Sequence, residues 1–211
     1  ELEKREVATA YLTESQIRSF LRNLPKTGMA EVIQDLLRLQ FLTAARVGEV
    51  AGLPWTEIDF RHGIWNLPAE RSKNKQAHRI LLSDQAMALL ERRKEESISP
   101  HVFPSPRTSR HVDTSLVGRY LQQHRETLCA PRGFTSHGLR HTALTQIAIL
   151  GYGKHIRDRI SNHKDNSVDA IYQHHEYDEE ARECWQAWAD RLDALGADNV
   201  APWKGGRRHG S

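Results

Sequence analysis

The chain has few cysteines and no long apolar run, and each shortage excludes a class of protein. Its two cysteines, Cys129 and Cys184, cannot form the disulfide framework of a small secreted domain, so a reducing cytoplasm suits the chain better. No apolar stretch approaches the roughly 18 residues of a membrane span, and the charged opening residues do not predict a signal peptide. A glycine-rich phosphate loop is also missing, which argues against a doubly wound nucleotide-binding fold.

The composition that is present is typical of a globular domain. The 211 residues are 38% hydrophobic and 27% charged, enough to bury the core of one large domain, with or without a small appendage. Lysine and arginine together exceed aspartate and glutamate by 30 to 27, a net charge of +3. This slight excess favours a polyanionic partner without requiring one.

The hydrophobic pattern predicts a mainly α fold with a small three-stranded antiparallel β-sheet. Three short segments alternate in character and are rich in aromatic and β-branched residues: 55–60, 63–69 and 77–83. Helical spacing predicts helices over 13–24, 30–44, 47–53, 84–96, 113–124, 136–150, 154–161, 165–174 and 178–195. Thr13 and Gln16 have the spacing of a capping box, and Ser136 is expected to cap the helix that follows it.

Several residues have the chemistry needed to break a phosphodiester. Such a reaction needs a nucleophile, cations on the non-bridging oxygens and an acid for the departing oxygen. Arg46 and Arg140 can bind phosphate oxygens with a planar, permanently charged fork. His137 lies three residues before Arg140, on the same helix face, and Tyr172 follows nearby as a candidate nucleophile.

Three segments carry these residues: TAARVGEV, HGLRH and NHKDNSVDAIY. In order and spacing they resemble the signature boxes of the tyrosine recombinases, the phage integrase family. Two further segments, AERSKNKQAHRILLS and EEARECWQAWADRLDAL, are most similar to prophage and genomic-island integrases. The resemblance runs from about Tyr11 to Leu195 and corresponds to the catalytic domain alone.

The resemblance implies a role for each matching residue. Arg46 corresponds to the first arginine of the family, and Glu49 to the acidic residue that supports it. Lys73 corresponds to the catalytic lysine, and Tyr172 to the nucleophile. His137 and Arg140 match the H-x-x-R box, and His163 matches the His-or-Trp position. One departure is that the family usually has Leu-Gly-His where this chain has Ile160, Ser161, Asn162 and His163 in the order ISNH.

The resemblance also implies the wider setting of the reaction. It predicts a site-specific recombinase that acts on double-stranded DNA attachment sites, with no metal and no ATP, as a homotetramer assisted by accessory DNA-bending proteins. The expected location is the bacterial cytoplasm, at the nucleoid. Residues 1–12 are expected to be a linker from a missing N-terminal DNA-binding region, 13–196 the catalytic domain, and 197–211 a flexible tail.

Other interpretations remain open at the level of sequence. The same chemistry without strand exchange would give a type IB topoisomerase-like enzyme that nicks and closes DNA. A degenerate site would leave only DNA binding, and a metal-dependent nuclease would need a carboxylate cluster that the sequence lacks. His137 and His141 have metal-ligand spacing without a third ligand. Tyr177 is a competing nucleophile outside the matching spacing.

Near the C-terminus, Trp185, Trp188 and Leu192 recur at helical spacing. Such a stripe most often packs into the core of its own domain. The alternative, which rests on the family resemblance, is a face that docks on a second protomer.

Overall fold

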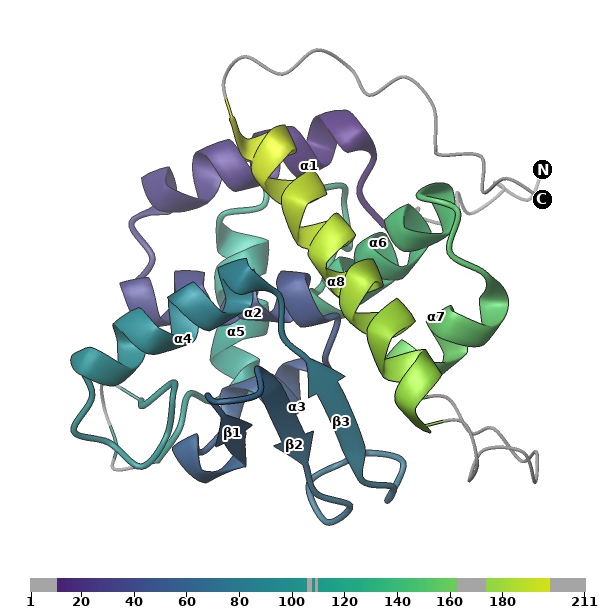
Figure 1. Cartoon of the computed structure of the whole chain (residues 1–211). Helices are drawn as coiled ribbons and strands as arrows, with labels where there is room; N and C mark the ends of the chain where they lie inside the picture. The colour runs from purple at the N-terminus through teal and green to yellow at the C-terminus, as the bar shows by residue number, and fades with distance from the viewer. Residues whose placement is uncertain (1–10, 106–107, 109, 163–173, 198–211) are drawn as a thin grey trace, which may run out of the picture.

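Helices form most of the structure, and one small sheet interrupts them (Figure 1). The computed structural model describes residues 11–105, 108, 110–162 and 174–197. The elements in chain order are α1 (Glu14–Asn23), η1 (Leu24–Thr27), α2 (Glu31–Thr43), α3 (Val47–Ala51), η2 (Trp55–Glu57), β1 (Ile58–Asp59), β2 (Ile64–Leu67), β3 (His78–Leu81), α4 (Asp84–Glu95), α5 (Thr114–Gln123), α6 (Ser136–Ile149), α7 (Lys154–Ile160) and α8 (His174–Gly196). The predicted mainly α fold with a three-stranded sheet is confirmed.

The sheet is antiparallel and follows the chain in the order β1-β2-β3. A tight turn joins β1 to β2, where Gly63 has a φ of 62°, a conformation that costs glycine little. In the second pair Ile64 lies opposite Leu81 and Leu67 opposite His78. The connection between β2 and β3, residues 68–77, is longer and carries Lys73.

The first helix begins where the sequence predicts. The Gln16 side chain accepts a hydrogen bond from the backbone N–H of Thr13 at 2.9 Å, and the Thr13 hydroxyl accepts one from the N–H of Gln16. These reciprocal bonds satisfy two of the backbone donors that a helix start leaves unpaired.

The longest helix, α8, ties the domain together. It contacts α1, α2, α4, α6, α7 and β3, and Figure 1 shows it crossing the molecule diagonally between them. Trp185, Trp188 and Leu192 are all buried within the chain. The Trp188 indole donates to the carbonyl of Phe41 at 2.8 Å, and the two rings meet edge to face at 5.3 Å. The prediction of a core stripe is therefore confirmed, and a docking role for these three residues is wrong.

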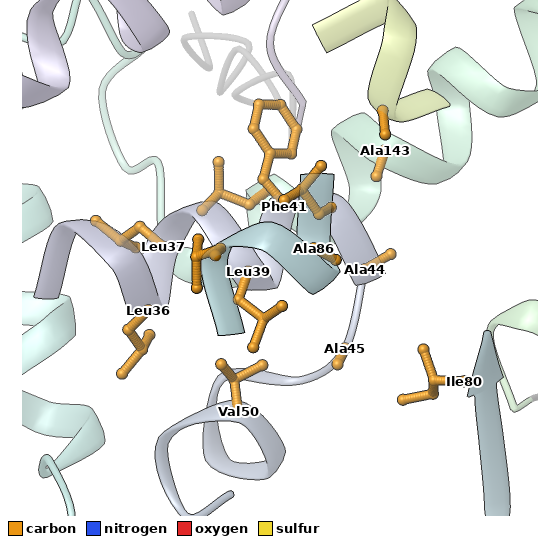
Figure 2. Packing of buried hydrophobic residues seen from close by; sticks show 14 of the residues in the cluster. Leu36, Leu37, Leu39, Phe41, Ala44, Ala45, Val50, Ile80, Ala86 and Ala143 are labelled. Atoms are coloured by element: carbon orange, nitrogen blue, oxygen red, sulfur yellow. The ribbon is translucent and has the colours of Figure 1, made fainter. Parts of the chain in front are cut away.

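The end of α2 shapes the region that carries Arg46. Ala44 adopts a left-handed φ of 47° and ends the helix, a conformation that costs an L-residue roughly 1–2 kcal/mol. Ala44 and Ala45 are both buried, so the surrounding packing holds the strained turn. Figure 2 shows them at the end of α2, with Val50 of α3 nearby and Ile80 of β3 facing the same segment.

Two sequence predictions about helix ends are wrong. Thr135 rather than Ser136 is the N-cap of α6, and no side chain caps that helix; Ser136 is its first residue. The last helix begins at His174 rather than at residue 178. Near its start, Asp178 pairs with Arg79 at 2.8 Å and the ring of Tyr177 packs under the guanidinium of Arg159.

The predicted helix over 165–174 lies outside the described residues except for its last residue. Across the ranges that the structure describes, no helix has both the length and the apolar character needed to cross a membrane.

Candidate active site

Arg46 is held in place by its neighbour in the first turn of α3. One carboxylate oxygen of Glu49 accepts from the Arg46 guanidinium at 3.0 Å, and the other accepts from the Arg46 backbone N–H at 2.9 Å. Glu49 is only 5% exposed, whereas the Arg46 side chain keeps a face toward solvent. The acidic residue thus fixes the arginine and leaves part of the guanidinium free to meet an anion.

Arg140 is the more deeply buried of the two arginines. It lies on α6 with 6% of its surface exposed. Its two terminal nitrogens donate to main-chain carbonyls, Nη1 to that of Ala44 and Nη2 to that of Ser161. The left-handed turn at Ala44 therefore has a direct use, because it presents a carbonyl to this guanidinium.

The positive charges of the two arginines repel each other, and this repulsion contributes to a lowered pKa of Arg140. Burial, and next the charge of Arg46, lower the pKa of Arg140 to about 10, while Glu49 opposes the shift. Arg140 is still a cation at neutral pH. A buried cation is stabilised by a bound anion, and paired guanidinium groups suit a phosphate.

Three consecutive carbonyls at the end of α7 accept hydrogen bonds from three different parts of the chain. The carbonyl of Ile160 lies 3.3 Å from Nε2 of His78 on β3. Those of Ser161 and Asn162 accept from Arg140 on α6 and from Asn74 in the β2–β3 connection. Carbonyls at a helix C-terminus have no partner within the helix, so this end is a natural acceptor. It joins the sheet, α6 and the connection immediately before His163.

Lys73 lies in the β2–β3 connection with its side chain exposed. The base of this connection is anchored by Arg71, which binds Glu57 at 2.6 Å and 2.9 Å and donates to the carbonyl of Glu49 at 3.0 Å. Gly52 leaves room for this arrangement, since a Cβ there would lie 2.7 Å from the Arg71 guanidinium. Lys73 is therefore presented from a fixed base.

His137 lies on the first turn of α6, where its side chain is exposed and close enough to Arg140, Lys73 and Arg46 for their charges to affect its pKa. Burial, then the charges of His141, Arg140, Lys73 and Arg46, lower its pKa from the usual 6.5. This shift favours the neutral imidazole, the form that can accept a proton. The rings of His137 and His141 meet edge to face at 4.4 Å. In the described part of the chain, no group of three or more His, Cys, Asp or Glu could hold a metal ion.

The structure therefore brings five of the predicted site residues into one region: Arg46, Glu49, Lys73, His137 and Arg140. His163 and Tyr172 lie outside the described residues, so their roles stay predictions. Tyr177, the competing nucleophile, is half-buried on α8. Its ring lies under the guanidinium of Arg159, 5.1 Å from the ring centre, and 6.3 Å from the ring of His155.

Sequence reasoning missed Asn74 and His78. Asn74 accepts from Nη2 of Arg46 at 3.1 Å, so it binds the terminal nitrogen that Glu49 does not. Neither residue could be found by local spacing, because their partners lie 28 to 88 residues away along the chain. The only signal was that Asn74 directly follows Lys73.

His78 makes folding stability depend on pH in a predictable direction. Burial is the main cause that lowers its pKa from 6.5 to about 4, with smaller contributions from Arg140 and Arg46. Below pH 6.5 His78 becomes protonated in the unfolded chain but stays neutral in the folded chain. The contribution of His78 to the free energy of unfolding should therefore be complete above pH 6.5 and decrease as the pH falls toward 4.

We expect His78→Gln, which keeps a donor for the Ile160 carbonyl and does not titrate, to remove about 1–2 kcal/mol of the loss between pH 7 and pH 5. Urea unfolding at both pH values measures it. An unchanged pH dependence in the variant would contradict the assignment of this shift to His78.

Comparison with known proteins adds to this geometry. The family model described as Phage integrase family matches residues 10–179. Prophage integrase IntA of Escherichia coli (strain K12) is 30% identical over 190 residues, which cover 88% of this chain and 45% of that protein. Prophage integrase IntZ of the same strain is 30% identical over 197 residues, covering 92% of this chain and 47% of that protein. The chain thus spans about half the length of these relatives.

Among solved structures, a lambda integrase (75–356) dimer bound to a COC′ core site superposes with a TM-score of 0.62. The identity is 18%, and the match covers 80% of this chain and 63% of the other. At this identity the similarity shows a common fold.

Proposed function

The chain belongs to the phage integrase family, and from this premise we propose that it is the catalytic domain of a site-specific DNA recombinase. The domain cleaves one DNA strand at a phosphodiester and becomes covalently attached to it through a 3′-phosphotyrosyl bond. The observation that supports this most is the pair of arginines. Arg46 precedes α3 as its N-cap and Arg140 lies on α6. The two influence each other electrostatically and are fixed by Glu49 and by main-chain carbonyls.

The chemistry follows from the groups around that pair. The Tyr172 oxygen attacks phosphorus and forms a new P–O bond while the bond from phosphorus to the 5′ oxygen breaks. Arg46 and Arg140 bind the non-bridging oxygens, where charge builds up in the transition state. The neutral His137 accepts the tyrosine proton or binds the phosphate, and His163 adds a hydrogen bond to the phosphate. Lys73 gives a proton to the departing 5′ oxygen.

The covalent link conserves the energy of the phosphodiester, so rejoining needs no ATP. A 5′-hydroxyl from a second duplex attacks the phosphotyrosine and completes strand exchange. We propose that the full-length protein does this as a tetramer on attachment-site DNA at the bacterial nucleoid, with accessory DNA-bending proteins. The lambda integrase bound to a COC′ core site and the Tn1549 transposon integrase in complex with circular intermediate DNA support the choice of partner.

DNA binding by the 211-residue chain should rest mainly on phosphate contacts. We expect weak binding to a 30-base-pair duplex of arbitrary sequence, with log affinity falling steeply and linearly against log salt concentration. Fluorescence anisotropy at several salt concentrations measures the slope. An affinity that does not change with salt concentration would contradict binding through phosphate contacts.

The direct test of the activity is a covalent adduct that survives denaturation. The chain is incubated with nicked duplexes of randomised sequence around the nick, so that a short cut strand diffuses away and rejoining stops. We expect a band of protein linked to DNA on a denaturing gel. Adducts that form but never exchange strands with a second duplex would favour the topoisomerase-like activity, and no adduct would leave only DNA binding.

A further inference from the structure

Asn162 stands at an unusual backbone position next to the predicted His163. Its φ is 52°, in the left-handed region, where glycine and asparagine are the residues best tolerated. Glycine would satisfy the backbone equally well. Asparagine differs only in its side chain, which raises the question of what that amide does.

The amide reaches across the chain to the β2–β3 connection. Nδ2 of Asn162 donates to the hydroxyl of Ser72 at 3.2 Å and lies 3.5 Å from the carbonyl of Gln76. In the opposite direction, Nδ2 of Asn74 donates to the main-chain carbonyl of Asn162. The two asparagines thus hold both arms of the connection against the end of α7.

These bonds enclose Lys73. Ser72 and Asn74, its two neighbours, are the residues that Asn162 binds, while Lys73 itself is exposed. The connection has little else to hold its tip, since the residues at 73, 75, 76 and 77 are all exposed and only Ser72 is buried. Without the two asparagines, the lysine would sit on a loop fixed at its base alone.

The same network reaches both arginines. Asn74 accepts from Arg46 at 3.1 Å, and the carbonyl that precedes Asn162, that of Ser161, accepts from Arg140. A movement of the connection would therefore disturb the hydrogen bonds that hold both guanidinium groups. The two neighbours of Lys73 and the two arginines thus belong to one set of hydrogen bonds, although they come from three separate parts of the chain.

We infer that Asn162, together with Asn74, is a positioning residue that latches the Lys73 connection over the arginine pair. The inference rests on the proposed function for its chemical consequence. The latch fixes the distance from the lysine ammonium to the 5′ oxygen as the P–O bond breaks, when that oxygen takes up the lysine proton. Neither asparagine takes part in the proton transfer.

The latch can be tested with a leaving group that needs no proton. When sulfur replaces the 5′-bridging oxygen, the departing thiolate is stable without protonation, so the position of Lys73 no longer matters. Asn162→Gly preserves the left-handed backbone and deletes only the amide. We expect it to slow adduct formation on ordinary DNA about fivefold to tenfold, the effect of one or two lost hydrogen bonds. On the sulfur substrate the variant should match the unaltered chain.

Two further variants sharpen the result. Ser72→Ala removes one acceptor of the Asn162 amide and should give the same pattern with a smaller loss. Asn74→Ala should be rescued only in part by sulfur, because it also removes a partner of Arg46. Asn66→Ala, an exposed amide on β2, is the matched control and should leave both rates unchanged.

Amide hydrogen exchange gives a readout that does not depend on the reaction. Exchange in residues 72–76 should accelerate in Asn162→Gly and stay constant in Asn66→Ala. Equal slowing of Asn162→Gly on oxygen and sulfur substrates, or unchanged exchange, would overturn the latch. Failure of the unaltered chain to form an adduct on either substrate would instead overturn the proposed function and, with it, the chemical role of the latch.

Discussion

Replacement of Tyr172 by phenylalanine is expected to abolish the covalent protein–DNA adduct while the fold and DNA binding persist. Tyr172→Phe removes one hydroxyl oxygen, and that oxygen is the atom that would become bonded to phosphorus. The remaining residues of the site can still bind the phosphate but cannot form the phosphotyrosyl bond. A denaturing gel with a nicked substrate, together with anisotropy for binding, measures both properties.

Tyr177 supplies the matched control, since it is the next tyrosine along the chain. Its ring is held between α7 and α8 by Arg159 and His155, contacts that do not need the hydroxyl. Tyr177→Phe should therefore form the adduct at the normal rate. An adduct that survives in Tyr172→Phe and disappears in Tyr177→Phe would move the nucleophile and refute the assignment of the C-terminal box.

Loss of Lys73 should have the second largest effect. An alkoxide is a poor leaving group, and a positioned acid contributes about 10²–10⁴-fold to such a step. We expect Lys73→Ala to slow cleavage of ordinary DNA by that factor and the sulfur-substituted substrate to restore most of the rate. Single-turnover adduct formation on the two substrates gives the comparison directly.

Lys75 and Arg46 provide the controls for this experiment. Lys75 has a left-handed φ of 56°, so Lys75→Gly removes the charge without straining the turn. It should cause a modest binding defect that depends on salt, and sulfur should not change it. Arg46→Ala should stay slow on both substrates, because charge on the non-bridging oxygens still needs stabilisation. If sulfur rescued Lys75→Gly rather than Lys73→Ala, the proton donor would be Lys75 and the assignment of Lys73 would be wrong.

The sequence by itself determined the features that depend on short spacing. The capping box of Thr13 and Gln16 and the three strands follow from local spacing. The pairing of Arg46 with Glu49, three residues later, is implied by the family resemblance, and the structure contains it. The order of the family boxes also assigned His163 and Tyr172, which no described contact tests. These predictions needed no knowledge of which distant segments meet.

Tertiary structure decided how the site is held together. Arg140 finds its acceptors 96 and 21 residues away, and Asn74 finds Asn162 across 88 residues. Two of these three carbonyls belong to the left-handed residues Ala44 and Asn162, and neither turn occurs at a glycine that would have revealed it. The first turns of α8 likewise meet distant segments, through Asp178 with Arg79 of β3 and Tyr177 with Arg159 of α7. Hydrogen bonds between distant segments leave no periodicity in the sequence, because packing of the helices and the sheet brings the partners together.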